Sequence, residues 1–273
     1  MSAYRPPLAR RRVGLLAGCA AAAIGAPAAA QTAFKADPTI VRGTASFSRT
    51  PTLDRIGIRS RQAVIDWAPQ DQAGTGPITV LPGGNTLQFE SGYGTSGPYT
   101  VLNRILPTDS SRPVVFDGTV RSRVTDPFTG NQTNGGSVWF YSPGGIIAGA
   151  TSQFDVGSLI LSANNILFGD GTVEGLFAGQ GPTAQTGIVR FDGEANTRGQ
   201  VTIQSGARVQ ASSNYVAFVA PRVSQNGRVT AAGSVAMIAA EAAEVTIPLA
   251  GGLFSIGVSR GTTVDAAGET VLT

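Results

Sequence analysis

Carboxylates are the main side chains in this sequence that could carry out chemistry. The 273-residue chain has no histidine and one cysteine, Cys19, so it lacks the residues for the usual zinc sites and for Ser–His or Cys–His nucleophile pairs. Enzymes that cleave polysaccharides need two or three acids on one face, often with Ca²⁺ or a basic residue. The acids that could supply such a face include Asp155, Asp170, Glu174, Asp192, Glu194, Glu241, Glu244, Asp265 and Glu269.

Two short segments bring acids close together. GDGTVEG at 169–175 contains Asp170 and Glu174, and FDGE occupies 191–194. Most of these acids adjoin glycine or end a strand-like run, where Asp commonly forms turns, and GDG lacks the spaced acids of a calcium loop. GQGPTAQTG at 179–187 has neither the Lys nor the following helix of a phosphate loop. We therefore expect no metal site, no cofactor and no enzyme activity.

The first 30 residues have the pattern of a secretory signal peptide. Four arginines precede an apolar stretch, and three alanines precede Gln31, so we expect cleavage between Ala30 and Gln31. Lipoprotein processing is the alternative, because LAGC at 16–19 would make Cys19 an acylated residue. Its apolar core would be shorter than such signals usually have. Cleavage after Ala30 leaves a mature chain without cysteine.

Removal of residues 1–30 changes the charge of the chain. The sequence has 20 basic and 17 acidic residues and a net charge of +3. Four arginines and no acid lie in the signal peptide, so the mature chain is near −1 and offers no basic excess to nucleic acid. No later segment approaches the about 18 continuous apolar residues of a membrane-spanning helix.

Short strands joined by turns dominate the mature chain. It combines 36 glycines and 16 prolines with only 14% charged residues over the full sequence, which is typical of many short strands and not of disorder. The strongest helical pattern, AAEAAEV at 239–245, is too short to stand as a helix. We expect an all-β protein.

An internal repeat of about 20 residues indicates stacked units. The offsets are 19 between VAFVAP (216–221) and VAMIAA (235–240), 20 between GARV (206–209) and NGRV (226–229), and 21 between VWFYS (138–142) and LILSA (159–163). A leucine-rich horseshoe would need a Leu and Asn framework that is absent, and a β-sandwich would give hairpin signals without this offset. The pattern favours a parallel β-helix.

The periodicity divides the mature chain into two parts. Residues 31–135 have weaker periodicity and longer Gly/Pro loops, and we expect them to form an amino-terminal cap and the first coils. Residues 136–273 should form further coils, which we expect to continue beyond the sequence. Asn226-Gly227, Asp170-Gly171 and Asp192-Gly193 are expected to supply positive φ at corners.

Several segments, taken in order, resemble the amino-terminal secretion domain of filamentous-haemagglutinin-type exoproteins, the passengers of two-partner secretion. The likeness extends over roughly residues 37 to 250. Its segments are AVIDWAPQ (63–70), NTLQF (85–89), VLNRIL (101–106), RPVVFDGTV (112–120), the run from Gly135 to Ile166 that contains VWFYSPGGIIAG, and the run from Ser213 to Ile247 that contains VAFVAP and VAMIAA.

The resemblance implies a fold and a role. The fold would be a right-handed, single-stranded, pectin-lyase-like parallel β-helix with an amino-terminal β cap. An outer-membrane barrel transporter would recognise the domain through periplasmic modules and export it to the cell surface or the medium. The exoprotein would be adhesin-like or haemagglutinin-like, with a host-surface or carbohydrate ligand.

The resemblance also implies candidate residues for transporter recognition. They are Asn103, Arg104, Ser142, Pro143, Gly144 and Gly145. The last four stand where the family has Asn-Pro-Asn-Gly, so both Asn side chains are replaced. Ser142 could still bond to the local backbone and Gly144 could hold positive φ. A purely structural use stays open for the turn, as a coil corner, and for Asn103 and Arg104, as a buried ladder residue and an ion-pair partner.

Two other functions remain open at this point. A carbohydrate-active β-helix enzyme, a lyase or hydrolase, would require three carboxylates converging on one outer face. A structural surface-layer or fibre protein would use its own transport route.

Overall fold

The computed structural model describes residues 32–91, 98–126, 128–167, 186–193, 198–248 and 255–261. All regular elements within these ranges are β-strands, so the all-β prediction is confirmed for them. The AAEAAEV segment, for example, leads into strand β23 (Ala242–Pro248). The predicted signal peptide with its cleavage site at Ala30 and Gln31, and the acidic segment 169–175, lie outside the described residues. Within the described ranges, no helix is long and apolar enough to cross a membrane.

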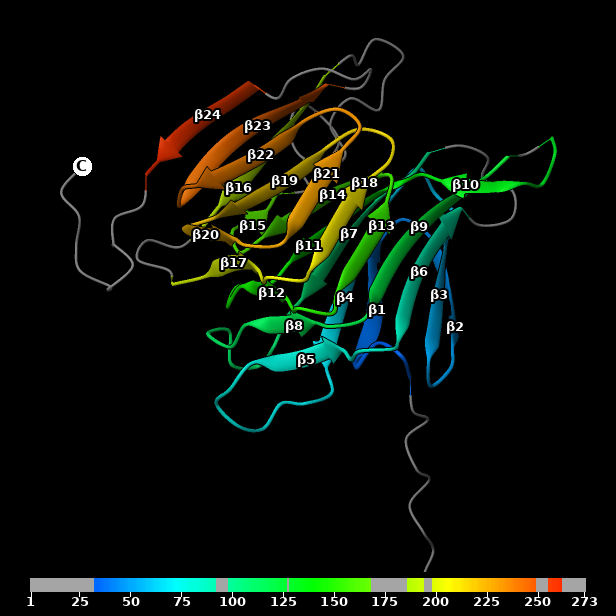
Figure 1. The fold of residues 1–273 in the computed structure, drawn as a ribbon, viewed down its shortest axis with the longest axis horizontal. Helices are drawn as coiled ribbons and strands as arrows, with labels where there is room; N and C mark the ends of the chain where they lie inside the picture. The colour runs from blue at the N-terminus through cyan, green and yellow to red at the C-terminus, as the bar shows by residue number, and fades with distance from the viewer. Residues whose placement is uncertain are drawn as a thin grey trace, which may run out of the picture. The chain divides into compact units, whose positions relative to one another are not determined.

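Most strands belong to three sheets, which we name A, B and C (Figure 1). Sheet A contains β1 (Ala36–Arg42), β4 (Gln62–Pro69), β7 (Thr100–Ile105), β11 (Ser137–Tyr141), β14 (Ser158–Ser162), β19 (Val216–Ala220) and β22 (Val235–Ala239), in that spatial order. Sheet B contains β2 (Ala45–Arg49), β3 (Leu53–Ile58), β6 (Thr86–Ser91), β9 (Thr119–Thr125), β13 (Gln153–Val156), β18 (Arg208–Ala211) and β21 (Arg228–Ala231), with β10 (Gln132–Asn134) paired to β9. Sheet C contains β5 (Ile78–Leu81), β8 (Val114–Phe116), β12 (Ile146–Ala148), β17 (Gln200–Ile203) and β20 (Arg222–Gln225).

From β4 onward the chain visits the three sheets in a fixed order, A then C then B. The successive rounds are β4-β5-β6, β7-β8-β9, β11-β12-β13, β14-β17-β18 and β19-β20-β21. All pairings between successive rounds are parallel. At one edge of the molecule, β1 pairs antiparallel with β4 in sheet A, and β2 pairs antiparallel with β3 in sheet B. The sheets are therefore mostly parallel, and each round stacks on the previous one.

The sequence repeat corresponds to the register of these sheets. Val138 pairs with Leu159 and Val216 with Val235, both between parallel strands of sheet A. The pairing of GARV with NGRV appears in sheet B, where β18 and β21 align residue for residue. Strand residues that repeat in the sequence thus occupy equivalent places in neighbouring rounds.

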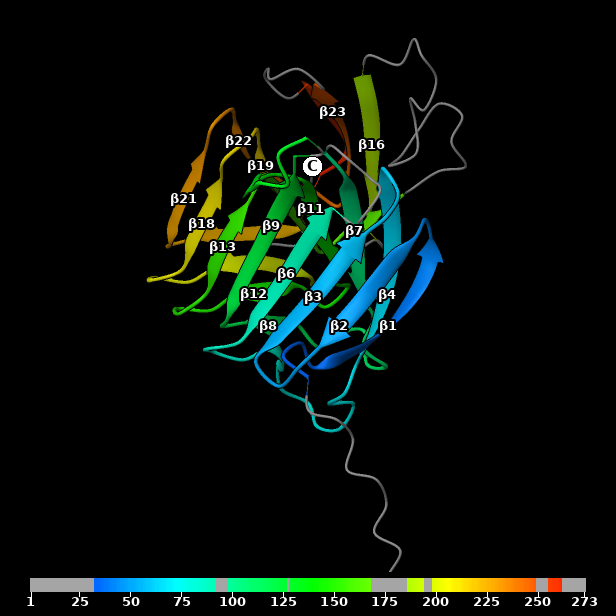
Figure 2. The same ribbon diagram turned by 90° about the vertical axis from the view of Figure 1, so that its right-hand side faces the viewer.

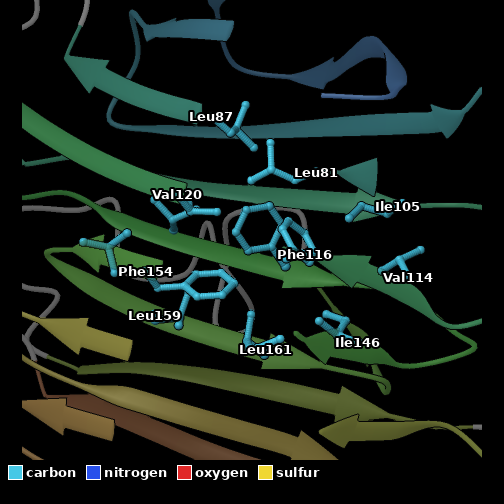
Figure 3. Close-up of a cluster of buried hydrophobic side chains, with 14 of the residues drawn as sticks. Leu81, Leu87, Ile105, Val114, Phe116, Val120, Ile146, Phe154, Leu159 and Leu161 are labelled. Atoms are coloured by element: carbon cyan, nitrogen blue, oxygen red, sulfur yellow. The ribbon is translucent and has the colours of Figure 1, made fainter. Parts of the chain in front are cut away.

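Inward-pointing side chains from all three sheets form one apolar core (Figure 3). Phe116 of sheet C packs against Phe140 of sheet A and Phe154 of sheet B, with ring centroids 5.0 and 5.7 Å apart. Burial of such aromatic side chains contributes about 1.5–3 kcal/mol each. A parallel arrangement of short strands is stable here because the core is shared between rounds.

A fourth sheet, D, covers part of the outer face of sheet A. It is antiparallel and contains β15 (Asn165–Ile166), β16 (Thr186–Asp192), β23 and β24 (Ser255–Arg260). Val189 and Phe191 of β16 join Trp139 and Ile160 of sheet A in a second buried cluster. Phe140 lies in the first cluster and Trp139 in the second, because successive side chains of a strand point to opposite faces of the sheet.

The prediction of positive φ at two corner glycines is wrong. Neither Gly227 nor Gly193 adopts it, and Gly171 lies outside the described residues. Both described glycines are needed for space, because a Cβ at Gly227 would lie 2.7 Å from the Ala207 carbonyl oxygen and one at Gly193 the same distance from the Glu241 carbonyl oxygen. Close approach of the neighbouring backbone explains these glycines.

Candidate functional site

The two predicted recognition segments lie side by side in sheet A. Asn103 and Arg104 belong to β7, and the Ser142–Gly145 turn directly follows β11. These strands pair in parallel, with Asn103 opposite Phe140 and Arg104 opposite Tyr141. The fold therefore brings residues almost forty positions apart in the sequence to the carboxyl ends of adjacent strands (Figure 1).

Asn103 is fully buried and hydrogen-bonded on both sides of its amide. Its Oδ1 accepts a hydrogen bond of 3.0 Å from Trp67 Nε1, and its Nδ2 donates one of 3.2 Å to the Trp139 carbonyl oxygen. Its neighbours in register are Ile65 and Phe140, so it forms no ladder of asparagines. Asn103 instead connects the strands on either side of β7.

Trp139 extends this connection to the outer side of sheet A. Its Nε1 donates a 3.0 Å hydrogen bond to the Tyr215 hydroxyl, which is buried beneath sheet D. Burial raises the pKa of Tyr215 to about 12, although hydrogen bonds from Ser137 and Trp139 partly oppose the shift. The phenol is therefore neutral near neutral pH and serves as a structural hydrogen-bond partner.

Arg104 forms a two-pronged ion pair with Asp66 of β4. The distances from Nε and Nη2 to the two carboxylate oxygens are 2.6 and 2.7 Å. The side chains are 20% and 26% exposed, so the pair lies at the surface of sheet A. Asp66 was not among the predicted residues. The sequence did contain a signal for this ion pair. Asp66 and Arg104 are each the one charged residue of their strand, and they occupy the same register position.

The Ser142–Gly145 segment forms a tight turn closed by its backbone. Gly145 N donates a 3.0 Å hydrogen bond to the Ser142 carbonyl oxygen, and Ser142 N donates one of 3.1 Å to that of Ser162. Positive φ occurs at Gly145, at +108°, and not at Gly144 as predicted. The expected local bond from the Ser142 side chain is also absent: its Oγ is buried and has no hydrogen-bond partner in the described part of the chain.

Both glycines of the turn pack closely against the backbone of neighbouring rounds. A Cβ at Gly144 would lie 2.3 Å from the Arg112 carbonyl oxygen, and one at Gly145 would lie 2.4 Å from that of Gln200. These backbones belong to the adjacent rounds before and after the turn, so neither can retreat easily. Glycine at 144 is therefore required by the packing between rounds.

Arg112 fixes the backbone that contacts Gly144. Its side chain is 3% exposed, Nε donates to the Gly76 carbonyl oxygen at 2.8 Å, and Nη2 lies 3.2 Å from Asp71 Oδ2. A buried arginine is retained only where its donors are satisfied. Sequence inspection missed this residue because nothing in RPVVFDGTV distinguishes a buried arginine from an exposed one.

The described acids among the candidates form ion pairs with three arginines, one of which is shared by two acids. Asp155 pairs with Arg123, Glu244 with Arg190, and Asp192 and Glu241 with Arg260. No group of three His, Cys, Asp or Glu side chains suited to a metal ion occurs among the described residues. Asp170, Glu174, Glu194, Asp265 and Glu269 lie outside those residues. The described acids therefore give no support to the carbohydrate-active enzyme hypothesis.

Comparison with known proteins adds no assignment. No protein-family model matches the sequence, and no curated protein is similar to it.

Proposed function

We propose that this chain is the secretion domain of a two-partner-secretion exoprotein. The observation that carries the proposal is the placement of three family-like segments. AVIDWAPQ, VLNRIL and VWFYSPGG supply β4, β7 and β11, which are consecutive parallel neighbours in one sheet. An accidental set of short likenesses would not be expected to fall on equivalent strands of successive rounds.

The proposed fold is a right-handed parallel β-helix with an amino-terminal cap. The repeated A-C-B order of the strands supports it, and parallel strands joined by crossovers are nearly always connected in the right-handed sense. The antiparallel strands β1 and β2 cover the first edges of sheets A and B, as a cap would, and so limit edge-to-edge association.

The burial of the candidate residues suggests when recognition takes place. Asn103 is fully buried and Gly145 is packed against Gln200 in the folded chain, so a transporter could not reach them there. We propose that the periplasmic modules of an outer-membrane barrel transporter bind the segment 138–147 while it is extended, by adding it as a strand. The rounds then fold outside the cell, each stacking on the one before.

The proposed location is the cell surface or the medium, and the proposed role of the whole exoprotein is adhesion or haemagglutination. The domain itself would act as an export signal. No enzyme activity is proposed for it.

Coexpression with a candidate transporter tests this function. Residues 1–273 are expressed in a bacterium with and without the transporter gene, and the chain is quantified in the medium and in the periplasm. We expect the medium to contain at least about tenfold more chain when the transporter is present. Equal amounts in the medium under both conditions would contradict the proposal.

A further inference from the structure

The outer face of sheet B carries an excess of arginine. Its strands lie side by side in Figure 2, and alternate residues of each strand point away from the core. On the strands from β3 to β21, the charged residues of this outward set are Arg55, Arg121, Arg123, Arg208, Arg228, Glu90 and Asp155. Five arginines face two carboxylates, so the surface has a local excess of three positive charges although the mature chain is close to neutral.

Four of these arginines have no partner among the described residues. Both carboxylates are already engaged, since Asp155 binds Arg123 at 2.9 Å and Glu90 accepts a 3.0 Å hydrogen bond from Gln88. The side chains of Arg55, Arg121, Arg208 and Arg228 are exposed and make no hydrogen bond or ion pair within the described part of the chain. Their guanidinium groups are available to an external anion.

Two of the four arginines are placed against each other. Arg208 of β18 pairs in register with Arg228 of β21, so two like charges stand on adjacent strands. Such an arrangement is destabilising in a sheet. Neither arginine side chain stabilises the fold through a hydrogen bond or ion pair to described residues. An anion that bridges both guanidinium groups would remove the repulsion. A guanidinium group binds carboxylate and sulfate-like oxyanions through two parallel N–H···O hydrogen bonds.

The spacing follows the stack. Adjacent strands are about 4.8 Å apart, so Arg208 and Arg228 are about one strand spacing apart. Arg55 and Arg121 share a register row with Gln88 between them, which separates them by about two spacings, or roughly 10 Å. Charges repeated along the direction of stacking suit a linear polymer with regularly spaced anionic groups.

We propose that the outer face of sheet B binds a linear acidic polysaccharide. The neutral outward residues are hydrogen-bonding side chains that suit sugar hydroxyls, namely Thr86, Gln88, Thr119, Gln153, Gln210 and Thr230. No aromatic residue points outward from β3, β6, β9, β13, β18 or β21, so the face lacks the stacking platforms that single-stranded nucleic acids require. The anionic groups would be sulfates or uronic-acid carboxylates. The proposal does not depend on the route by which the chain is exported.

Binding to immobilised heparin, which carries both sulfate and carboxylate groups, tests the proposal. The purified chain is compared with the double variants R55Q/R121Q and R208Q/R228Q. The control is R59Q/R61Q, which removes the same charge from exposed arginines in the connection between β3 and β4. We expect each face variant to bind about tenfold more weakly than the original chain and the control to bind equally well. Raising the salt concentration should weaken binding.

Further arms identify the polymer and exclude a folding effect. Polygalacturonate supplies carboxylates without sulfate. Binding to it would show that carboxylate groups are sufficient for recognition, whereas binding to heparin alone would show that sulfate groups are required. Both results support the proposal. Urea unfolding should show R208Q/R228Q to be at least as stable as the original chain, because the repulsion is gone. Absence of binding to both acidic polymers, equal binding to neutral dextran, tighter binding to single-stranded DNA, or the same loss in R59Q/R61Q would overturn it.

Discussion

Replacement of Gly145 by alanine is expected to lower the free energy of unfolding by about 3 kcal/mol or more. Two costs combine at this position. A residue with a Cβ is strained at positive φ by about 1–2 kcal/mol, and the added carbon would lie 2.4 Å from the Gln200 carbonyl oxygen, where the two rounds would have to separate. Urea denaturation of the purified chain measures the change.

The chain contains a matched control for this substitution. Pro82-Gly83-Gly84 forms a second Pro-Gly-Gly turn, between sheets C and B, in which Gly84 has φ +82° and open space around its missing Cβ. Gly84→Ala should therefore cost only the backbone strain, about 1–2 kcal/mol. Equal losses for the two variants would show that the contact between rounds at Gly145 contributes nothing to stability.

Replacement of Asn103 by leucine is expected to lower the free energy of unfolding by about 3 kcal/mol. The side chains are similar in volume, so the main effect is the loss of two hydrogen bonds. The Trp67 Nε1 donor and the Trp139 carbonyl acceptor would be left buried without Asn103, and a buried polar group without a partner costs about 1–3 kcal/mol. Urea denaturation followed by tryptophan fluorescence reports the change and the altered environment of both indoles.

Asn226→Leu is the control for the buried amide. Asn226 is exposed, and its side chain makes one long hydrogen bond, 3.4 Å, to Ser224 Oγ. Its replacement should change the free energy of unfolding by no more than about 0.5 kcal/mol. If Asn103→Leu were as mild as Asn226→Leu, the buried amide would not stabilise the connection between β4, β7 and β11.

Much of the fold could be predicted from the sequence because the repeat is itself the strand register. Aligning VAFVAP with VAMIAA gives the observed pairing of Val216 with Val235 without further information. Sheet D could not be anticipated in the same way. Its strands come from segments on either side of β17 to β22, and β16 pairs with β23 between residues 50 to 62 positions apart, which no local pattern encodes.

The candidate residues were named from the sequence, but their arrangement was not predicted. The pairing of β7 with β11 is what places Asn103 and the Ser142–Gly145 turn on neighbouring strands. The conformation of the turn was assigned to the wrong glycine, because sequence alone does not reveal that Arg112 and Gln200 approach Gly144 and Gly145. Packing between rounds decides which glycine adopts positive φ and which one only leaves space.

The proposed recognition by an outer-membrane barrel transporter is tested most directly by the affinity of that transporter's purified periplasmic modules for this chain, before and after the chain has folded. We predict binding to the unfolded chain and at least about tenfold weaker binding to the folded chain, in which Asn103 and Gly145 are buried. Pro143→Ala should weaken binding to the unfolded chain about tenfold, whereas Pro82→Ala, in the matched turn, should leave it unchanged. Equal affinity for both states, or equal effects of the two proline substitutions, would contradict recognition of the extended 138–147 segment.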